Sequence, residues 1–271
     1  LVGSEMCIRD RYEAKRDRST IALYDAERDQ NSVRNLSLSG ELRNAVRAQE
    51  MTLQYQPQID VATGRTIGAE ALIRWEHPRY GFVSPAEFIP LAEQSGIIRP
   101  LTRWILGEAI RQLSEWRHVG FDIGISVNLS PRNLHEDDLP EVVLRLLESY
   151  GVPPERVTLE LTENAIMTDP DRALAAIREL KSCGVRLAID DFGTGYSSLS
   201  YLKSLPVDEL KIDRTFVIAM TEDGGDEVIV RSTIDLAHTL GLSVVAEGVE
   251  AEAHLGMLHR LGCDIAQGYR I

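Results

Sequence analysis

The sequence predicts an α/β fold in which eight strands, alternating with helices, close into a TIM-type (β/α)₈ barrel. After residue 40, short apolar segments typical of strands alternate with segments whose apolar residues recur at helical spacing. Strands that alternate with helices pair in parallel through right-handed crossovers. Eight such strands in a chain of 271 residues, 44% of them hydrophobic, fit one closed barrel.

The composition excludes several broad classes of protein. A formal net charge of −13 does not suit a binder of nucleic acid polymers, so a small anionic substrate would need a metal ion or a few arginines and lysines. No apolar run approaches the roughly 18–20 residues of a membrane span. Cys7, Cys183 and Cys263 lack metal-binding spacing and cannot all pair, which favours reduced thiols and a cytoplasmic location.

Residues 1–39 are expected to lie outside the barrel. Residues 1–11 lack the apolar core and cleavage site of a signal peptide and are interpreted as a non-native scar. Residues 12–39 are mostly polar, apart from a strand candidate at Ile21–Tyr24, and are interpreted as the remnant of an upstream domain with its linker. Leu42 and Val46 then predict a helix that enters the main domain, residues 40–271.

Strand and helix signals follow in order through this domain. A turn at Thr63–Gly64 separates the first two strands, and so short a connection joins antiparallel strands, so the first strand should run against the others. Helices are predicted after Ser84-Pro85, through Ala109–Trp116, after Asp169-Pro170 and before Gly184, Gly241 and Gly262. The eight predicted strands are Thr52–Ile59, Arg65–Trp75, Ile123–Leu129, Val157–Thr162, Val185–Asp190, Val207–Ile212, Ser243–Glu247 and Cys263–Gln267.

Alternation along these strands directs polar side chains to one rim of the barrel. In Val157–Thr162 the apolar residues share one face, which should pack on helices, so Glu160 points inward. The same parity recurs on the later strands, and chemistry on such barrels occurs at the carboxyl ends of the strands. The inward residues at or near these ends are Glu70, Leu72, Arg74, Asn128, Glu160, Asp190, Glu209, Lys211, Asp213, Glu247 and Gln267.

Carboxylates and an asparagine that converge on one mouth predict a cation site. Like charges within a few ångströms recruit cations or raise each other's pKa, and oxygen-only ligands suit Mg²⁺ or Mn²⁺. The adjacent Asp190 and Asp191 could bridge two ions, as in two-metal phosphoryl transfer, with a turn at Phe192-Gly193 bringing both carboxylates to the same mouth. The alternatives are a helix cap plus a turn residue, or a solvated acidic rim.

The same residues carry a resemblance to a known family, the EAL-domain cyclic di-GMP phosphodiesterases. The resemblance covers about residues 40 to 271 and is specific only when its motifs are taken together. The matching motifs are Gln56-Pro57, Glu70-Ala71-Leu72 with Arg74, Val127–Ser130, Leu159–Glu163, Asp190–Gly195, Leu210–Asp213, Ala246–Glu250 and Gln267–Tyr269.

This resemblance implies roles for individual residues. Glu70, Asn128, Glu160 and Asp190 would bind one Mg²⁺ or Mn²⁺ ion, and Asp190, Asp191 and Glu247 a second, with Ca²⁺ inhibitory. Lys211, Glu247 and Asp191 would act in catalysis. Glu163, Phe192 and Gly193 would couple the loop after the fifth strand, Asp191–Tyr196, to a dimer interface. The implied substrate contacts are Gln56, Leu72, Arg74, Asn128, Asp213 and Gln267.

The resemblance also implies an activity and a wider protein. The domain would hydrolyse cyclic di-GMP to linear pGpG and form a homodimer. Residues 12–31 are similar to the end of a GGDEF domain and its linker, so the natural protein would be a tandem in which a GGDEF-like domain precedes this one. The family continues past Gln267-Gly-Tyr into a closing helix, which is not expected here. Two other readings stay open: a receptor that binds the dinucleotide without turnover, and an enolase-type barrel with a lysine base.

Overall fold

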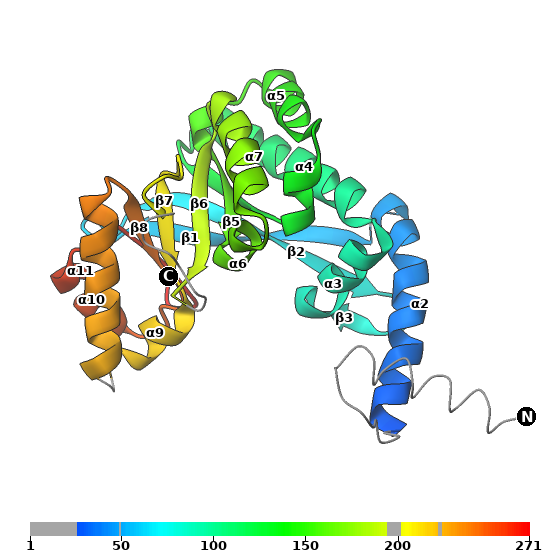
Figure 1. Cartoon of the computed structure of the whole chain (residues 1–271), viewed down its shortest axis with the longest axis horizontal. Helices are drawn as coiled ribbons and strands as arrows, with labels where there is room; N and C mark the ends of the chain where they lie inside the picture. Colours follow the sequence, from blue (N-terminus) through cyan, green and yellow to red (C-terminus); the bar gives the residue numbers. More distant parts are fainter. Residues whose placement is uncertain (1–25, 49, 194–201, 222–223) are drawn as a thin grey trace, which may run out of the picture.

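Eight strands close into a barrel in the computed structural model, which describes residues 26–48, 50–193, 202–221 and 224–271 (Figure 1). The sheet order is β1-β9-β8-β7-β6-β5-β4-β2-β3, and pairing of β1 with β2 closes the ring. The strands are β1 Met51–Asp60, β2 Thr66–His77, β3 Gly81–Val83, β4 Gly124–Leu129, β5 Val157–Thr162, β6 Arg186–Phe192, β7 Glu209–Ile212, β8 Ser243–Ala246 and β9 Ile265–Gln267.

The direction of β1 confirms the prediction of an antiparallel first strand. It pairs antiparallel with both β2 and β9, whereas the pairs from β2–β4 round to β8–β9 are parallel. The short strand β3 was not predicted. It pairs with the end of β2 at Trp75–His77, beyond the barrel wall, and three residues are too few for a periodic pattern.

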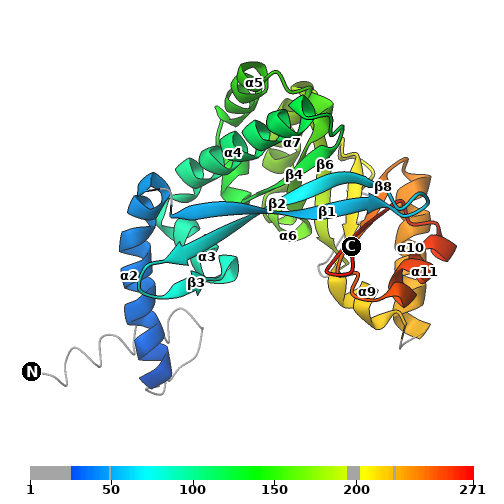
Figure 2. The ribbon, with the colours of Figure 1, turned by 180° about the vertical axis from the view of Figure 1, so that it is seen from behind.

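Helices surround the barrel, with α4, α5 and α7 on one side and α10 and α11 on another (Figure 2). Gly241 and Gly262 follow α10 and α11 as predicted, each in the left-handed region. The helices are α2 Ala26–Ala48, α3 Pro85–Ser95, α4 Ile98–His118, α5 Leu139–Tyr150, α6 Glu163–Thr168, α7 Pro170–Ser182, α9 Arg214–Ala219, α10 Gly224–Thr239 and α11 Glu252–Leu261, with 3₁₀ turns η1 Pro131–His135 and η2 Pro154–Arg156.

Helix α2 begins earlier than predicted, at Ala26, so part of the segment interpreted as a linker is helical. Its residues Leu38, Leu42 and Ala45 are buried, and Glu41 Oε2 lies 2.9 Å from Nε2 of His77 at the end of β2. The strand candidate Ile21–Tyr24 and residues 1–11 lie outside the described residues. Within the described part of the chain, no helix is both long enough and apolar enough to cross a bilayer.

The barrel interior is polar rather than filled by branched apolar side chains. Toward the amino ends of the strands lies a partly open cavity of about 200 Å³, whose lining includes Ser126, Thr158, Arg186 and Glu209. Glu209 is buried and pairs with Arg186 at 2.7 Å. The apolar faces of the strands, such as Val157, Leu159 and Leu161, point outward and are buried in the core. The predicted alternation is therefore confirmed: apolar residues of the strands face the helices, and polar residues face the barrel interior.

Candidate active site

A buried lysine lies at the centre of the acidic mouth. Lys211, on β7, is only 1% exposed, and its Nζ lies 2.6 Å from Glu160 Oε2 and 2.6 Å from Glu247 Oε1. Asp190 Oδ1 at 3.3 Å and Glu70 Oε2 at 3.6 Å complete the shell. These side chains come from β2, β5, β6, β7 and the residue after β8, so closure of the barrel brings together positions far apart in the sequence.

Glu70 is held by two side-chain amides as well as by Lys211. Asn128 Nδ2 donates to its Oε1, and Gln267 Nε2 donates to its Oε2. Gln267 also donates to Gln56 Oε1 at 2.9 Å, and its own Oε1 accepts from Gln58 Nε2 at 2.9 Å. Glutamines on β1 and β9 thereby fix one side of the mouth.

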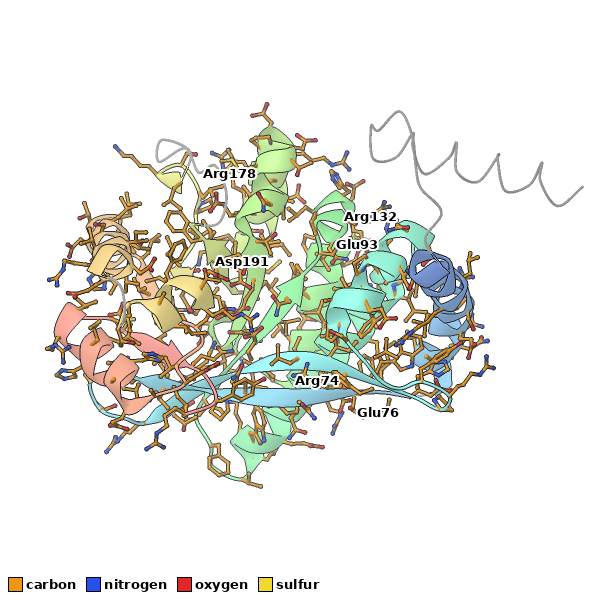
Figure 3. All side chains as sticks on the ribbon, turned by 90° about the horizontal axis from the view of Figure 1, so that it is seen from below. Arg74, Glu76, Glu93, Arg132, Arg178 and Asp191 are labelled. Carbon is orange, nitrogen blue, oxygen red and sulfur yellow. The ribbon has the colours of Figure 1, made fainter. Side chains whose placement is uncertain are left out.

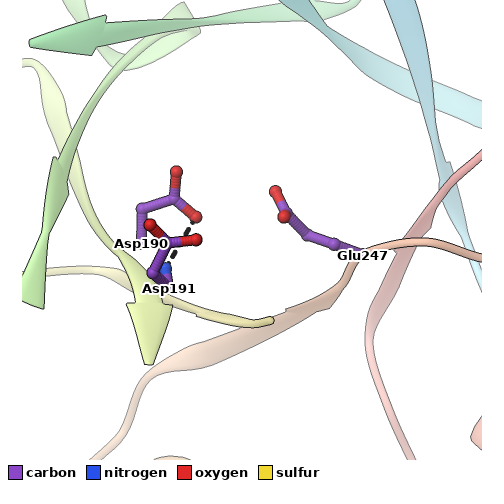
Figure 4. Close-up of side chains that lie close together, drawn as sticks. All are labelled: Asp190, Asp191 and Glu247. Carbon is purple, nitrogen blue, oxygen red and sulfur yellow. Dashed lines mark hydrogen bonds between the residues drawn. The ribbon is translucent and has the colours of Figure 1, made fainter. Parts of the chain in front are cut away.

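Asp190, Asp191 and Glu247 form a second acidic group in which one oxygen from each lies within 4.8 Å of the others (Figure 4). Pairing of β6 with β7 shifts register between Ile189 and Phe192, so Asp190 and Asp191 together oppose one residue. Such a bulge re-aims a side chain. Asp191 adopts a left-handed φ of 55°, and its N–H donates to Asp190 Oδ1 at 2.9 Å.

This geometry adds a bulge before the expected turn at Phe192-Gly193. A bulge at Asp190 and Asp191 inside β6, two residues before the expected turn, brings the two carboxylates together, and the chain then turns at Gly193, which adopts a left-handed φ of 97°. The Asp190 carboxylate accepts a hydrogen bond from the N–H of Asp191 inside β6, and this is not the helix-cap contact of the alternative interpretation. Glu70, Glu160 and Asp190 are also buried, which is the reverse of a solvated acidic rim.

The electrostatics of the mouth follow from several carboxylates sharing one lysine. Burial lowers the pKa of Lys211, but the carboxylates around it, Glu160 first, raise that pKa well above its usual range. Burial, together with Glu70 and Asp190, raises the pKa of Glu160 well above its ordinary value against the pull of Lys211. Negative charge is therefore in excess at this end of the barrel.

The pKa values of Glu247 and Asp191, in the second acidic group, are raised like that of Glu160. Burial raises the pKa of Glu247 to about 7, with Lys211 opposing and Asp190 and Glu70 adding to the shift. Burial, and then the charges of Asp190 and Asp213, raise the pKa of Asp191. Buried carboxylates whose ionised forms are disfavoured in this way are suited to holding cations.

The expected substrate contacts lie around this centre. Arg74 is on the part of β2 that extends beyond its pairing with β4, and its Nε donates to Gln54 Oε1 at 2.9 Å. In Figure 3, Arg74 lies along the β1–β2 ribbon, and Asp191 lies away from that ribbon. Leu72 is half-buried on the same strand. Asp213 caps α9 by accepting from Thr215 N at 2.9 Å, so it has a structural role in addition to the expected one.

Glu163 connects the end of β5 to the end of β6. It is the first residue of α6, it is buried, and its Oε2 accepts from Gly193 N at 3.1 Å. Its Oε1 is buried with no hydrogen-bond partner among the described residues. Phe192, the residue before Gly193, is also buried. The remainder of the expected coupling loop, residues 194–196, lies outside the described residues.

Sequence reasoning missed Gln58 and Gln54. Gln58 is buried and orients Gln267, and Gln54 accepts from Arg74. The signal was present, because Gln54, Gln56 and Gln58 alternate along β1 and therefore share a face.

The chain is therefore a closed α/β barrel with an antiparallel first strand, and the acidic cluster at its mouth, beside a buried lysine, could hold a metal ion. The EAL domain family matches residues 39–271, and this chain belongs to that family. It is 42% identical over 260 residues to the bifunctional diguanylate cyclase/cyclic di-GMP phosphodiesterase MucR of Pseudomonas aeruginosa, covering 95% of this chain and 38% of that protein.

Two further comparisons agree with that assignment. The cyclic di-GMP phosphodiesterase PA2567 of Pseudomonas aeruginosa is 37% identical over 251 residues, covering 92% of this chain and 43% of that protein. The solved structure of the PaMucR phosphodiesterase in complex with c-di-GMP superposes with a TM-score of 0.82 at 44% identity, covering 86% of this chain and 95% of that one. This chain thus spans about two fifths of the length of these two curated relatives.

Proposed function

We propose that this domain is a metal-dependent phosphodiesterase that hydrolyses cyclic di-GMP to linear pGpG. The observation that carries the proposal is the buried Lys211 within 3.6 Å of Glu70, Glu160, Asp190 and Glu247, beside the further carboxylate of Asp191. Two relatives are named as cyclic di-GMP phosphodiesterases, and the PaMucR structure contains c-di-GMP. Their names support this substrate for the present chain.

The residues at the mouth fit two divalent cations. One lysine faces five carboxylates, so two doubly charged ions would balance the remaining negative charge. Glu70, Asn128, Glu160 and Asp190 would hold one Mg²⁺ or Mn²⁺ ion, and Asp190, Asp191 and Glu247 the other. When bound, such ions polarise a phosphoryl oxygen and lower the pKa of a bound water.

The side chains of this chain would divide the remaining work. Lys211, held by Glu160 and Glu247, would place a fixed positive charge beside the attacked phosphate and orient the attacking water. Arg74 would hold a substrate phosphate through its guanidinium. Gln267, fixed between Gln56 and Gln58, would position the dinucleotide against Glu70.

The wider setting of the domain is also a proposal. The hydrogen bond from Gly193 to Glu163 supports coupling of the β6 loop to a homodimer interface. Cys183 and Cys263 are buried free thiols, which fits action in the cytoplasm. The relatives are much longer than this chain, which fits a tandem with an upstream GGDEF-like domain.

The deciding experiment is release of pGpG from cyclic di-GMP by the purified chain with Mn²⁺ and with EDTA. Hydrolysis that requires Mn²⁺ is expected, with no nucleotide released in EDTA. Tight binding of cyclic di-GMP without pGpG at any Mn²⁺ concentration would identify a receptor instead and overturn the proposal.

A further inference from the structure

Two glycines each follow, in sequence, a residue of the proposed site. Gly248 follows Glu247 at the end of β8, and Gly268 follows Gln267 at the end of β9. Each is packed so closely against a neighbouring strand exit that a side chain would not fit. These contacts join three consecutive strand ends, which carry Lys211, Glu247 and Gln267.

Gly248 packs on the beginning of α9. A Cβ added there would lie 2.5 Å from the Cβ and 3.2 Å from the Cα of Arg214, and the residue has a left-handed φ of 73°. Arg214 comes three residues after Lys211, and the Glu247 N–H donates to Ile212 O at 3.2 Å. The residues that follow β8 therefore pack directly on the residues that follow β7. This packing places Glu247 Oε1 2.6 Å from Lys211 Nζ.

Gly268 packs in the same way on the exit of β8. A Cβ added there would overlap the backbone N, C and O of Val249. Val249 N donates to Gln267 O at 3.0 Å, and Arg270 N donates to Val249 O at 3.0 Å, so the chain after β9 wraps round this one residue. Backbone atoms cannot rotate out of the way, so a side chain would push the two exits apart.

We infer that Gly248 and Gly268 are positioning residues that set the spacing of Lys211, Glu247 and Gln267. Glu247, Asp190 and Asp191 are the group that would hold the second cation, so a displacement of Glu247 relative to the two aspartates weakens cation binding before it disturbs the rest of the barrel. This inference rests on the proposed function for the identity of the bound cations.

A matched pair of variants isolates the close contact from backbone strain. Gly248→Ala and Gly241→Ala both place alanine at a positive φ, 73° and 78°, but nothing lies within 4 Å of a Cβ at Gly241. Gly241→Ala should lose thermal stability through backbone strain alone, and Gly248→Ala should lose more, because the overlap with Arg214 adds to the same strain. Calorimetric titration with Mn²⁺ should give at least tenfold weaker binding for Gly248→Ala, and less than a threefold change for Gly241→Ala.

The steric origin can be tested by rescue. Arg214→Gly removes the atom 2.5 Å from the added Cβ and leaves the Cα at 3.2 Å and the carbonyl O at 3.6 Å. The double variant Gly248→Ala/Arg214→Gly should recover most of the lost Mn²⁺ affinity, whereas Arg214→Gly alone should bind Mn²⁺ like the wild type. In turnover assays, Gly248→Ala should show a lower kcat and a higher Mn²⁺ requirement, with KM for cyclic di-GMP unchanged.

A second pair covers Gly268. Gly268→Ala should lose Mn²⁺ affinity, whereas Gly256→Ala, in α11 with only the tip of Arg260 at 3.7 Å, should not. If Gly268→Ala does not fold, the Gly248 series decides alone. The inference is overturned if folded Gly248→Ala binds Mn²⁺ as tightly as Gly241→Ala, or if Arg214→Gly restores nothing. Wild-type protein that binds Mn²⁺ but releases no pGpG would overturn the proposed activity instead, since the calorimetric comparison does not depend on turnover.

Discussion

The ammonium of Lys211 lies 2.6 Å from the carboxylate of Glu160, and both side chains are 1% exposed. Burying two opposite charges is costly, and removing one partner leaves the other without compensation. The pair is therefore poor evidence for stability but good evidence for a site, since the same lysine also contacts Glu247 at 2.6 Å.

Lys211→Met should reveal the energetic cost of leaving the buried Glu160 carboxylate without its counter-charge. Without metal, the free energy of unfolding should fall by about 3–5 kcal/mol, because Glu160 keeps no buried counter-charge. Added Mn²⁺ should stabilise the variant more than the wild type. Urea denaturation with and without Mn²⁺ measures both effects, and Lys203→Met, at an exposed position, is the control. If Mn²⁺ stabilises the variant and the wild type equally, Lys211 and the cations do not interact with the same carboxylates.

Asp191→Asn should separate binding from chemistry. The change keeps an oxygen and nearly the same volume but removes one negative ligand of the Asp190, Asp191 and Glu247 group. Turnover should fall by at least about 10²-fold, comparable with loss of one strong electrostatic stabiliser. Affinity for cyclic di-GMP in Ca²⁺ should change far less, because Arg74 and Gln267 remain.

Calorimetric titration beside a pGpG assay measures the two quantities for Asp191→Asn. Asp235→Asn, on the exposed face of α10, provides the same chemical change away from the mouth and should behave as wild type. A variant at Asp191 that keeps wild-type turnover, or loses binding in step with rate, would show that the residue is misassigned.

The identity of the cation should decide between turnover and binding. Mg²⁺ and Mn²⁺ suit compact oxygen sites, whereas Ca²⁺ prefers longer bonds and looser coordination. Hydrolysis should appear with the first two ions, and Ca²⁺ should support binding of cyclic di-GMP while blocking pGpG release. Rates that are equal in EDTA and in Mn²⁺ would contradict a metal-dependent mechanism.

Arg186→Met should destabilise the opposite end of the barrel. Burial raises the pKa of Glu209 above its ordinary value of 4.5, and Arg186 at 2.7 Å opposes that shift. Without the guanidinium, the buried carboxylate is unpaired at neutral pH, and the free energy of unfolding should fall by about 1–3 kcal/mol, less than for a fully buried pair because the Arg186 side chain is 39% exposed. Metal affinity should be retained, because the pair lies away from the mouth.

The pH dependence of that loss has a definite sign. A carboxyl whose folded-state pKa is raised holds its proton more tightly in the folded state, so stability falls as pH rises from about 4.5 through the folded-state pKa. Arg186→Met removes an opposing influence and should cost more at pH 8 than at pH 5 in urea denaturation. Arg145→Met, on an exposed pair with Glu141, should be indifferent to pH. A cost at Arg186 that is independent of pH would contradict the assignment.

Much of the site was predictable because it depends on local periodicity. Alternation along a strand places Glu160 opposite Leu159 and Leu161 whatever the rest of the chain does, and the same rule orients Glu70, Asp190 and Lys211. The Thr63–Gly64 turn likewise determined that β1 runs against β2, because only an antiparallel pair can be joined so briefly.

Tertiary structure decided how these residues meet. The sharing of Lys211 among four carboxylates, the hold of Gln58 on Gln267 and the pairing of Arg186 with Glu209 all depend on closure of the ring and on strand register. Asp191 reaches the mouth through a bulge set by pairing of β6 with β7, which no pattern within β6 specifies. Periodicity in a sequence orients a side chain relative to its own strand, whereas distances across a barrel follow only when all the strands are in place.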